Sequence, residues 1–319
     1  MNPTRRTTTL ALLAAAAGNP LARAADDFPS RPVKVIVPYA AGGADTFIRP
    51  LQATLEKKHH INLVIESVVG AGGTIGANRV KRSPADGYTL LFCGSGALTI
   101  APKLQGDSLA VADFVPIVNL VTIPYIVATR KESSLRTPRE FVDFVRQNPG
   151  KLNYGSPGLG SAPHLGMEAM AAALGSSVTH VPFSGIATAV QAILGGHVEA
   201  VIGAPSVVMP QVKAGKLWAI GVTSGARFPL TPDLPTLAEA GAPVEVATHF
   251  GFLAPRATPP QVVEKLAAAL RDAARDPAFI AAMEDMQTQV NVMPSGAFAK
   301  ALAAEAAAFE PVIAKLPRQ

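Results

Sequence analysis

Six segments rich in glycine and serine recur at one point of a repeating pattern, each after a β-rich run and before a helical pattern. Such a segment presents backbone N–H groups at the start of a helix, where the helix dipole also favours negative charge. Parallel strands end at one edge of a sheet, and ligands bind in the crevice there. The pattern therefore predicts an anion site, suited to a carboxylate, that needs no arginine. The segments are residues 38–45, 70–74, 94–97, 155–161, 184–186 and 203–206.

Any one of these segments alone is explained better by a tight turn between a strand and a helix. Their repetition along one predicted edge is what favours a binding site. The polar side chains that could complete the site are Asp45, Ser95, Ser156, Ser161 and His164. At the start of a helix, His164 either donates a hydrogen bond to a ligand or is a structural histidine, and the sequence leaves both roles open.

Catalytic motifs are incomplete in this sequence. Ser95 lacks both flanking glycines that a nucleophile elbow needs, and Ser156 has only one of them, Gly158. The dinucleotide pattern G-x-G-x-x-G breaks at Ile75, and no Walker loop occurs. The pair His59-His60 has no acidic or cysteine partner at ligand spacing, so we expect no metal site. We therefore expect a binding protein without catalytic residues or cofactor, with an enzyme on a similar scaffold as the alternative.

Composition supports a folded globular protein. The chain has 319 residues, of which 49% are hydrophobic and 16% charged, and this length predicts two domains. Three arginines precede residue 25, and without them 25 basic residues face 23 acidic ones, a net charge of +2. No basic run accompanies this balance, so nucleic acid is not an expected partner. The single cysteine, Cys93, lies in a predicted buried strand and cannot form an internal disulfide.

The first 24 residues are predicted to be a signal peptide. Arg5 and Arg6 form a positive segment, residues 10–17 form a short apolar run, and residues 22–24 fit the cleavage rule before Ala25. The run is too short to span a bilayer. The paired arginines also resemble a twin-arginine signal, so Sec and Tat export both stay open. Either route predicts a soluble periplasmic protein, and an ordinary amphipathic N-terminal helix is the alternative.

Short β-rich runs alternate with helical patterns up to residue 222, which predicts mostly parallel sheets with helices on both faces. Pro50 lies inside the first helical pattern and should kink that helix or shift its start. From Pro259 onward we expect helices with no strand between them, packed on a sheet that was built earlier. The predicted strands are residues 33–37, 62–66, 89–93, 152–154, 178–181, 198–202 and 217–222.

A helical tail that returns to an earlier sheet suggests that the chain leaves one domain, builds a second and comes back. We place the two crossings near residues 117–125 and 247–253, and we expect ligand to close the domains about them. Two independent domains in series would give similar local patterns. The expected organisation is a signal peptide over residues 1–24, a discontinuous first domain over 25–122 plus 250–319, and a second domain over 123–249.

Several motifs, weak one by one, resemble a single known family in combination. Tyr88 lies in a segment, residues 84–91, of the pattern P-x-D-G-Y-T-L-L. The order and spacing of the motifs hold from about residue 28 to the C-terminus, and the chain resembles the Bug-type substrate-binding proteins of tripartite tricarboxylate transporters. The other matching segments are residues 35–39 with 42–43, 70–77, 150–156, 180–183, 214–217 and 234–236.

The resemblance implies an α/β type II periplasmic binding fold, in which two domains joined by two crossing strands close on a ligand. It implies a small organic acid as the ligand and delivery to a membrane permease made of one large and one small subunit. We expect a monomer without cofactor or metal. A ligand-sensing partner of a membrane signalling protein is an alternative, because that role needs the same binding domain.

The resemblance also implies which residues contact the ligand. In the family, the first loop after a strand and a Gly/Ser loop of the second domain hold the carboxylate, largely through backbone groups and water. Carried onto this chain, these are Tyr39, Gly42, Gly43 and Asp45 with Ser156, Gly158, Ser161 and His164. The further expected contacts are Gly72, Ser95, Phe183 and Pro205.

The chain also departs from the family pattern. The first loop is one residue short between Gly43 and Asp45, which puts the role of Asp45 in question, and Pro50 is unusual in the helix that follows. Residues 67–69 replace a more polar segment before the glycines. Residues 203–204, Gly-Ala, stand where relatives often carry Asp-Asn. This last change removes polar groups from the rim of the second domain and is expected to alter ligand choice.

Overall fold

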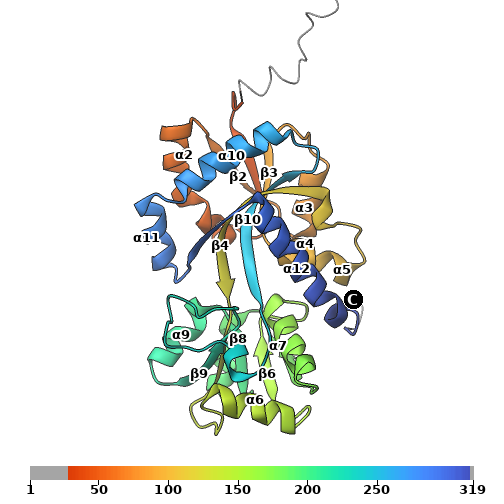
Figure 1. The fold of residues 1–319 in the computed structure, drawn as a ribbon, viewed down its shortest axis with the longest axis vertical. Helices are drawn as coiled ribbons and strands as arrows, with labels where there is room; N and C mark the ends of the chain where they lie inside the picture. Colours follow the sequence, from red (N-terminus) through yellow and green to blue (C-terminus); the bar gives the residue numbers. More distant parts are fainter. Residues whose placement is uncertain (1–27, 317–319) are drawn as a thin grey trace, which may run out of the picture.

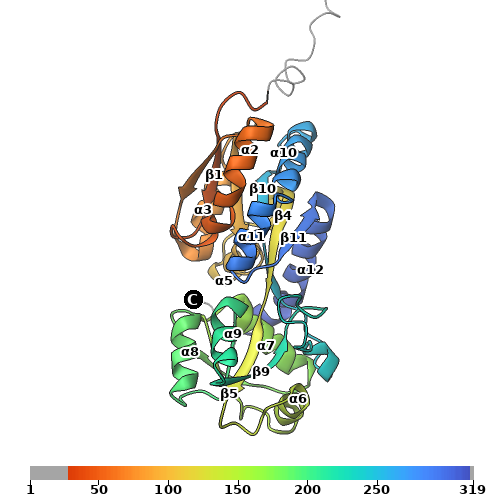
Figure 2. The same ribbon diagram turned by 90° about the vertical axis from the view of Figure 1, so that its left-hand side faces the viewer.

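The chain forms two β-sheets, each covered by helices and joined by strands that pass from one sheet to the other (Figure 1). The arrangement is that of a computed structural model, which describes residues 28–316. The predicted signal peptide lies outside these residues. Figure 2 shows the two lobes one above the other, with the connecting strands along the long axis. None of the helices in the described part is long and apolar enough to cross a membrane.

The first lobe is built on a six-stranded sheet with the order β11-β4-β10-β3-β1-β2. β1 pairs in parallel with β2 and β3, β10 runs antiparallel to β3 and β4, and β11 runs antiparallel to β4. The strands are β1 (Val33–Val37), β2 (Leu63–Ser67), β3 (Thr89–Gly94), β4 (Phe114–Pro124), β10 (Ala247–Pro255) and β11 (Val290–Pro294).

Helices cover both faces of this sheet, which explains why β1 reads as a nearly continuous apolar run. Val35 and Val37 belong to the core under α2, α10 and α11, whereas Ile36 belongs to the core under α3, α4 and α12. The helices are α2 (Gln52–His59), α3 (Thr74–Lys81), α4 (Gly96–Thr99), α5 (Ala101–Gln105), α10 (Pro260–Ala273), α11 (Pro277–Asp285) and α12 (Ser295–Ile313).

The second lobe is built on a five-stranded sheet with the order β7-β6-β8-β5-β9. β6 is parallel to β7 and β8, while β5 is antiparallel to β8 and β9. The strands are β5 (Ile126–Arg130), β6 (Asn153–Ser156), β7 (Thr179–Pro182), β8 (Ala200–Gly203) and β9 (Leu217–Val222). The helices are α6 (Pro138–Gln147), α7 (Ala162–Ala173), α8 (Ile186–Leu194) and α9 (Pro205–Lys213).

Two strands carry the chain between the lobes. β4 continues into β5 with only Tyr125 between them, and β10 brings the chain back. Thr223 holds both crossings where they reach the second lobe, since its hydroxyl accepts from the N–H of Tyr125 at 2.9 Å and its carbonyl accepts from the N–H of Val246 at 2.9 Å. Thr223 therefore links the two crossings.

Three sequence predictions about the elements need correction or refinement. The C-terminal helices do have a strand between them, because β11 lies between α11 and α12 and pairs with the edge of β4. The sheets are mixed rather than mostly parallel, since the strands that enter and leave the second lobe pair antiparallel with their neighbours. Pro50 lies in a 3₁₀ turn, Arg49–Leu51, and the α-helix begins only at Gln52.

The Tyr88 motif has a structural role in this protein. Asp86 accepts a hydrogen bond from the N–H of Tyr88 at 3.0 Å, and Gly87 between them has φ of +85°. A Cβ at Gly87 would lie 2.3 Å from Cγ1 of Val262 on α10. The motif therefore makes the tight turn that brings β3 against α10.

Candidate ligand cleft between the two lobes

The crossing strands separate two cavities. Successive side chains of a strand point to opposite sides, so Thr248 and Phe250 of β10 border one cavity, while Ala247 and His249 border the other. We call the first the front cavity and the second the rear cavity. Both lobes contribute to each of them, so a change in the angle between the lobes alters both.

The front cavity has a volume of about 560 Å³, which lies in the range of small-molecule sites. The loop between β6 and α7 forms its wall in the second lobe. The first lobe contributes the end of β1, the glycine loop before α3, and helices α4 and α5. None of the described residues that line it carries a charged side chain. Its polar side chains are those of Tyr39, Gln105, Tyr125, Ser161 and Thr248, and its larger apolar ones are those of Ile100, Leu104, Leu159, Ile186 and Phe250.

Two of these polar side chains are bonded within the first lobe. The Tyr39 hydroxyl accepts from the N–H of Gly94 at 3.2 Å and donates to its carbonyl at 3.5 Å. The amide of Gln105 donates to the carbonyl of Ala71 at 2.8 Å and accepts from the hydroxyl of Thr74 at 3.0 Å. Both side chains therefore stabilise the loops around the cavity.

The other three polar side chains are bonded at the hinge or in the second lobe. The hydroxyls of Tyr125 and Thr248 bond each other across the two crossing strands, so together they retain one hydrogen that no described residue accepts. The Ser161 hydroxyl donates to the carbonyl of Gly158 at 2.8 Å. The free hydroxyl hydrogen at the hinge and the second N–H of the Gln105 amide are thus the side-chain donors that the described lining residues leave for a ligand.

Hydrogen bonds fix the loop between β6 and α7. The N–H of Gly158 donates to Oγ of Ser156 at 3.2 Å, and the N–H of Gly160 donates to Nδ1 of His164 at 3.1 Å. Ser161 caps α7, because its Oγ accepts from the N–H of His164 at 3.4 Å. Glycine is favoured at positions 158 and 160, where φ is +133° and +73°.

Two N–H groups of this loop have no acceptor among the described residues, those of Leu159 and Ala162. Both residues line the front cavity. Ala162 is the first residue of α7, where the helix dipole favours an anion. Pro163 follows and supplies no donor. These two groups are therefore the backbone donors that the loop can offer to a carboxylate.

Two stacked histidines, His164 and His180, support the loop between β6 and α7 through hydrogen bonds. The ring centroids of His164 and His180 lie 4.0 Å apart, and Nε2 of His180 is 2.7 Å from Oγ of Ser156. Desolvation, with a smaller contribution from His180, lowers the pKa of His164 to about 4, and desolvation also lowers the pKa of His180. Because Gly160 donates to Nδ1, neutral His164 carries its proton on Nε2. Through Nδ1, His164 thus helps to hold the loop in shape.

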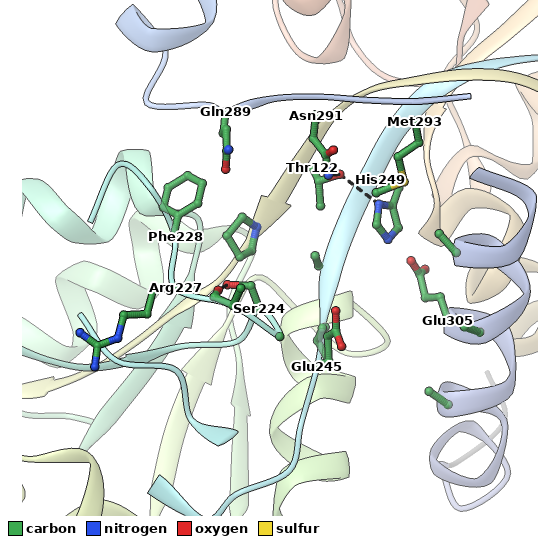
Figure 3. A pocket seen from close by; sticks show the side chains of 18 of the residues that line it. Thr122, Ser224, Arg227, Phe228, Glu245, His249, Gln289, Asn291, Met293 and Glu305 are labelled. Carbon is green, nitrogen blue, oxygen red and sulfur yellow. Dashed lines mark hydrogen bonds between the residues drawn. The ribbon is translucent and has the colours of Figure 1, made fainter. Parts of the chain in front are cut away.

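The rear cavity has a volume of about 700 Å³ and collects polar side chains from both lobes (Figure 3). The Thr122 hydroxyl lies 3.1 Å from Nδ1 of His249, and Glu245 and Glu305 line the same cavity. Oε1 of Glu305 accepts from the hydroxyl of Thr99 at 2.6 Å, whereas Oε2 is buried without a partner among the described residues. Burial raises the pKa of Glu305 to about 7.

The residues predicted for the ligand site fall into three groups. Six lie in or directly under the wall of the front cavity. The lining residues among them are Tyr39, Gly72, Gly158 and Ser161, and the supporting ones are Ser156 and His164. The structure therefore brings together the Gly/Ser loop of the second lobe and two loops of the first.

A second group of predicted residues is held by other side chains of the protein. Asp45 is buried and forms an ion pair with Arg49, with an N–O distance of 2.8 Å. Ser95 is buried at the hinge, where its Oγ accepts from the N–H of His249 at 3.2 Å and lies near Glu305. These groups stabilise the first lobe and the hinge.

The third group lies outside the lining of the front cavity. Gly42 and Gly43 are exposed and outside the lining. Phe183 packs over Gly155, where an added Cβ would lie 3.0 Å from its ring. Pro205 begins α9 directly after Ala204, which does line the front cavity.

Sequence reasoning missed the apolar wall and the hinge contacts. Leu104 reaches across the cavity, since a Cβ at Gly160 would lie 2.2 Å from its Cδ1. Ile186, Thr248 and Phe250 also line the cavity. The crossing near residues 247–253 was recognised, and strand alternation within it is the signal that could have identified Thr248 and Phe250 as facing one side.

Within residues 28–316 no group of three His, Cys, Asp or Glu side chains is placed to hold a metal ion. Cys93 is a buried free thiol whose pKa is raised by desolvation. The arrangement can enclose a small ligand and offer N–H donors to an anion.

Comparison with known proteins places these features in context. Residues 47–317 match the model of the tripartite tricarboxylate transporter family receptor. The chain is 35% identical over 269 residues to a UPF0065 protein in the tcbD-tcbE intergenic region of Pseudomonas sp. strain P51, which covers 82% of this chain and 79% of that protein. It is 32% identical over 289 residues to protein BugT of Bordetella pertussis, with 88% of each chain covered.

Solved structures agree with this likeness. A TctC solute-binding protein from Polaromonas, without ligand, has a TM-score of 0.83 at 29% identity and covers 91% of this chain and 100% of its own. MatC from Rhodopseudomonas palustris with bound malate has a TM-score of 0.69 at 32% identity, covering 90% and 100%. A second R. palustris protein, with adipate, has a TM-score of 0.70 at 28% identity, covering 91% and 98%. The predicted two-domain periplasmic binding fold is confirmed.

Proposed function

This chain belongs to the tripartite tricarboxylate transporter receptor family, the family that its motifs resemble, and on that premise we propose that it captures a small carboxylic acid in the front cavity. The observation that carries the proposal is the pair of uncommitted N–H groups of Leu159 and Ala162 beside a cavity of ligand size. Two relatives of known structure have malate and adipate bound, which supports a carboxylate as the ligand.

The carboxylate is held mainly by the main chain. The N–H groups of Leu159 and Ala162 donate to it, and the free hydroxyl hydrogen of the Tyr125–Thr248 pair supplies a third donor from the hinge. The hydroxyls of Ser156 and Ser161, expected from the sequence as direct contacts, hold the loop in shape instead. The proposed site thus uses the loop that the sequence predicted, but the carboxylate is bound by its backbone N–H groups and not by its serine hydroxyls.

The two lobes are the domains that close on the ligand, with the chain changing lobe at Tyr125 and again at the start of β10. Closure about these strands narrows the front cavity and alters the rear one. The protein then delivers the acid to a membrane permease from the periplasm. The family description, a transporter receptor, supports this role.

A thermal-shift screen over organic acids tests the function. An acid at a hundred times its dissociation constant should stabilise the protein by about 2.7 kcal/mol. Two matched variants then locate the site, because Ala101 and Ala301 are half-buried helical residues that line the front and rear cavities respectively. Ala101→Trp should abolish the shift and Ala301→Trp should retain it. The reverse result would move the site to the rear cavity.

A further inference from the structure

We propose that the protein takes up a proton on the buried carboxyl group of Glu305 when the front cavity binds its carboxylate, so that affinity for the acid falls as the pH rises. The inference rests on the proposed function and deepens it, since it concerns how the same site responds to pH. It follows from the place of Glu305 between the front and rear cavities.

Glu305 lies on α12 and lines the rear cavity, behind the wall that the first lobe gives to the front cavity (Figure 3). Its Oε1 is 2.6 Å from the hydroxyl oxygen of Thr99, the last residue of α4. Gly96 and Ala97, at the start of the same short helix, line the front cavity. Because α4 and α12 both belong to the first lobe, this contact does not depend on the angle between the lobes.

The ionised form of Glu305 has few partners. A carboxylate can accept hydrogen bonds at about four positions. Here Oε2 is buried without a partner among the described residues, and Oε1 competes with the carbonyl of Ser95, at 3.0 Å, for the single hydroxyl hydrogen of Thr99. A proton on Oε1 removes the competition, since Glu305 then donates to the Thr99 oxygen and Thr99 donates to Ser95. Burial accordingly raises the pKa of Glu305 to about 7.

The charge of Glu305 acts on the polar groups of the front cavity. Desolvation raises the pKa of the Tyr125 hydroxyl, and the negative charge of Glu305 adds to this increase. It adds in the same way to the raised pKa of Tyr39, for which burial is the largest cause. The proposed ligand carboxylate contacts the free hydrogen of the Tyr125–Thr248 pair. A field that opposes a negative oxygen on Tyr125 also opposes a carboxylate bound against it.

This opposition is reciprocal, as any coupling between two binding equilibria must be. Ionised Glu305 weakens the binding of the acid, and the bound acid raises the pKa of Glu305 further. Like charges about 10 Å apart in a protein interior disfavour each other by roughly tenfold. Near neutral pH the acid therefore binds together with a proton, and the proton goes to Glu305.

Three groups that face Glu305 from the first lobe and the hinge stay protonated at neutral pH. Desolvation is the largest cause of the raised pKa in Cys93 on β3, in Tyr39 and in Tyr125. The imidazole of His249 on β10 is neutral in this range, because desolvation lowers its pKa. Titration of these four groups therefore does not produce the expected pH dependence above pH 6.5.

The second lobe also carries ionisable groups close to α12. Glu245 and Arg227 line the rear cavity, and Arg227 is paired with Glu239 at an N–O distance of 2.7 Å. On α7, which packs against α12, burial raises the pKa of Glu168, and this carboxyl group accepts from the hydroxyl of Tyr154 at 2.9 Å. All these groups remain in a Glu305→Gln variant, so the variant isolates the contribution of Glu305.

The test is a calorimetric titration of the purified protein in MOPS and in Tris, two buffers that differ in ionisation enthalpy, which counts the protons taken up. The probes are malate, adipate, hexanoate and benzoate, and an acid found only in the thermal-shift screen is titrated in the same way. For a pKa that rises from about 7 by roughly one unit, we expect an uptake of about half a proton at pH 7.5. Affinity should be about fivefold weaker at pH 8.5 than at pH 6.5.

Three variants locate the proton. Glu305→Gln should bind the acid without proton uptake and with an affinity that stays constant between pH 6.5 and pH 8.5. The control, Glu245→Gln, removes the same charge from an exposed side chain of the same rear cavity and should retain the uptake. Thr99→Val keeps Glu305 but removes its donor, so the pH at which affinity falls should increase.

The outcomes separate this inference from the proposed function. If an acid binds to the wild-type protein without proton uptake, or if Glu305→Gln takes up as much as the wild type, the inference is overturned while the carboxylate function stands. If no acid binds in these titrations or in the wider screen, both fail. Uptake in the wild type and in Glu245→Gln, with none in Glu305→Gln, supports both.

Discussion

The backbone N–H of Gly160 donates a hydrogen bond to Nδ1 of His164 across 3.1 Å, which ties the loop of the front cavity to an unprotonated imidazole nitrogen. Protonation of Nδ1 would remove this acceptor. The stacked ring of His180 and the burial of both rings oppose that protonation. The shape of the ligand loop therefore depends on neutral histidines beneath it.

This contact predicts a pH-dependent stability. The pKa of His164 is about 4 in the folded protein and near 6.5 when unfolded, so the unfolded state binds more protons between these values. The histidine contributes its full stabilisation above pH 6.5 and loses it as the pH falls towards 4. Each unit of the shift corresponds to about 1.4 kcal/mol. Urea unfolding between pH 4 and pH 7.5 measures the effect.

His164→Gln is the matched variant, since glutamine keeps a hydrogen-bond acceptor but does not titrate. Its unfolding free energy should fall less than that of the wild type between pH 6.5 and pH 4. An equal fall in both proteins would show that the histidine is not the group responsible.

The contact between Gly160 and Leu104 predicts a cost for any side chain at position 160. Gly160→Ala forces a left-handed backbone on alanine, at roughly 1–2 kcal/mol, and displaces Leu104 as well. Gly175→Ala has the same backbone strain, with φ of +67°, but no atom within 4 Å of the new Cβ. Only Gly160→Ala should weaken ligand binding, and calorimetry on both variants checks this. Partial recovery by adding Leu104→Ala would identify the clash as the cause.

The buried carboxyl group of Glu305 should make the stability of the protein fall as the pH rises, the opposite of the effect expected for His164. Its folded pKa of about 7 lies above the value of 4.5 for an exposed glutamate, because burial disfavours the charged form. The carboxyl group therefore lowers stability as the pH rises from 4.5 through 7. Glu305→Gln should be more stable than the wild type at pH 8, by up to a few kcal/mol, and the difference should shrink at pH 5. A constant difference across this range would contradict the assignment.

The general location of the binding loop could be predicted from the sequence. Gly158 and Ser161 lie between a strand and a helix, and local backbone rules place such a loop at the sheet edge. Their hydrogen-bond partners could not be predicted, because His180 reaches Ser156 from a neighbouring strand that is 24 residues away. Whether the Ser156 hydroxyl contacts the ligand or supports the loop depends on this tertiary contact with His180.

The apolar wall and the strand β11 were missed for related reasons. Leu104 lies on a helical stretch whose direction depends on how α5 packs against the second lobe. Residues 290–294 alternate in the manner of a strand, but the segment is short and lies between alanine-rich helices. Its pairing with the edge of β4 is a non-local contact that local patterning does not encode.

The most direct test of the central claim removes one backbone donor from the ligand loop. Ala162→Pro deletes the N–H at the first position of α7, where proline is well tolerated. The preceding residue, Ser161, already has the extended backbone that proline requires, with ψ of 152°. Ala162→Gly keeps the donor and serves as the control. Calorimetry with the tightest-binding acid should show affinity reduced roughly tenfold to a hundredfold in Ala162→Pro and little changed in Ala162→Gly, since a hydrogen bond to a charged group contributes about 1.5–3 kcal/mol. Wild-type affinity in a correctly folded Ala162→Pro variant would contradict the main-chain carboxylate site.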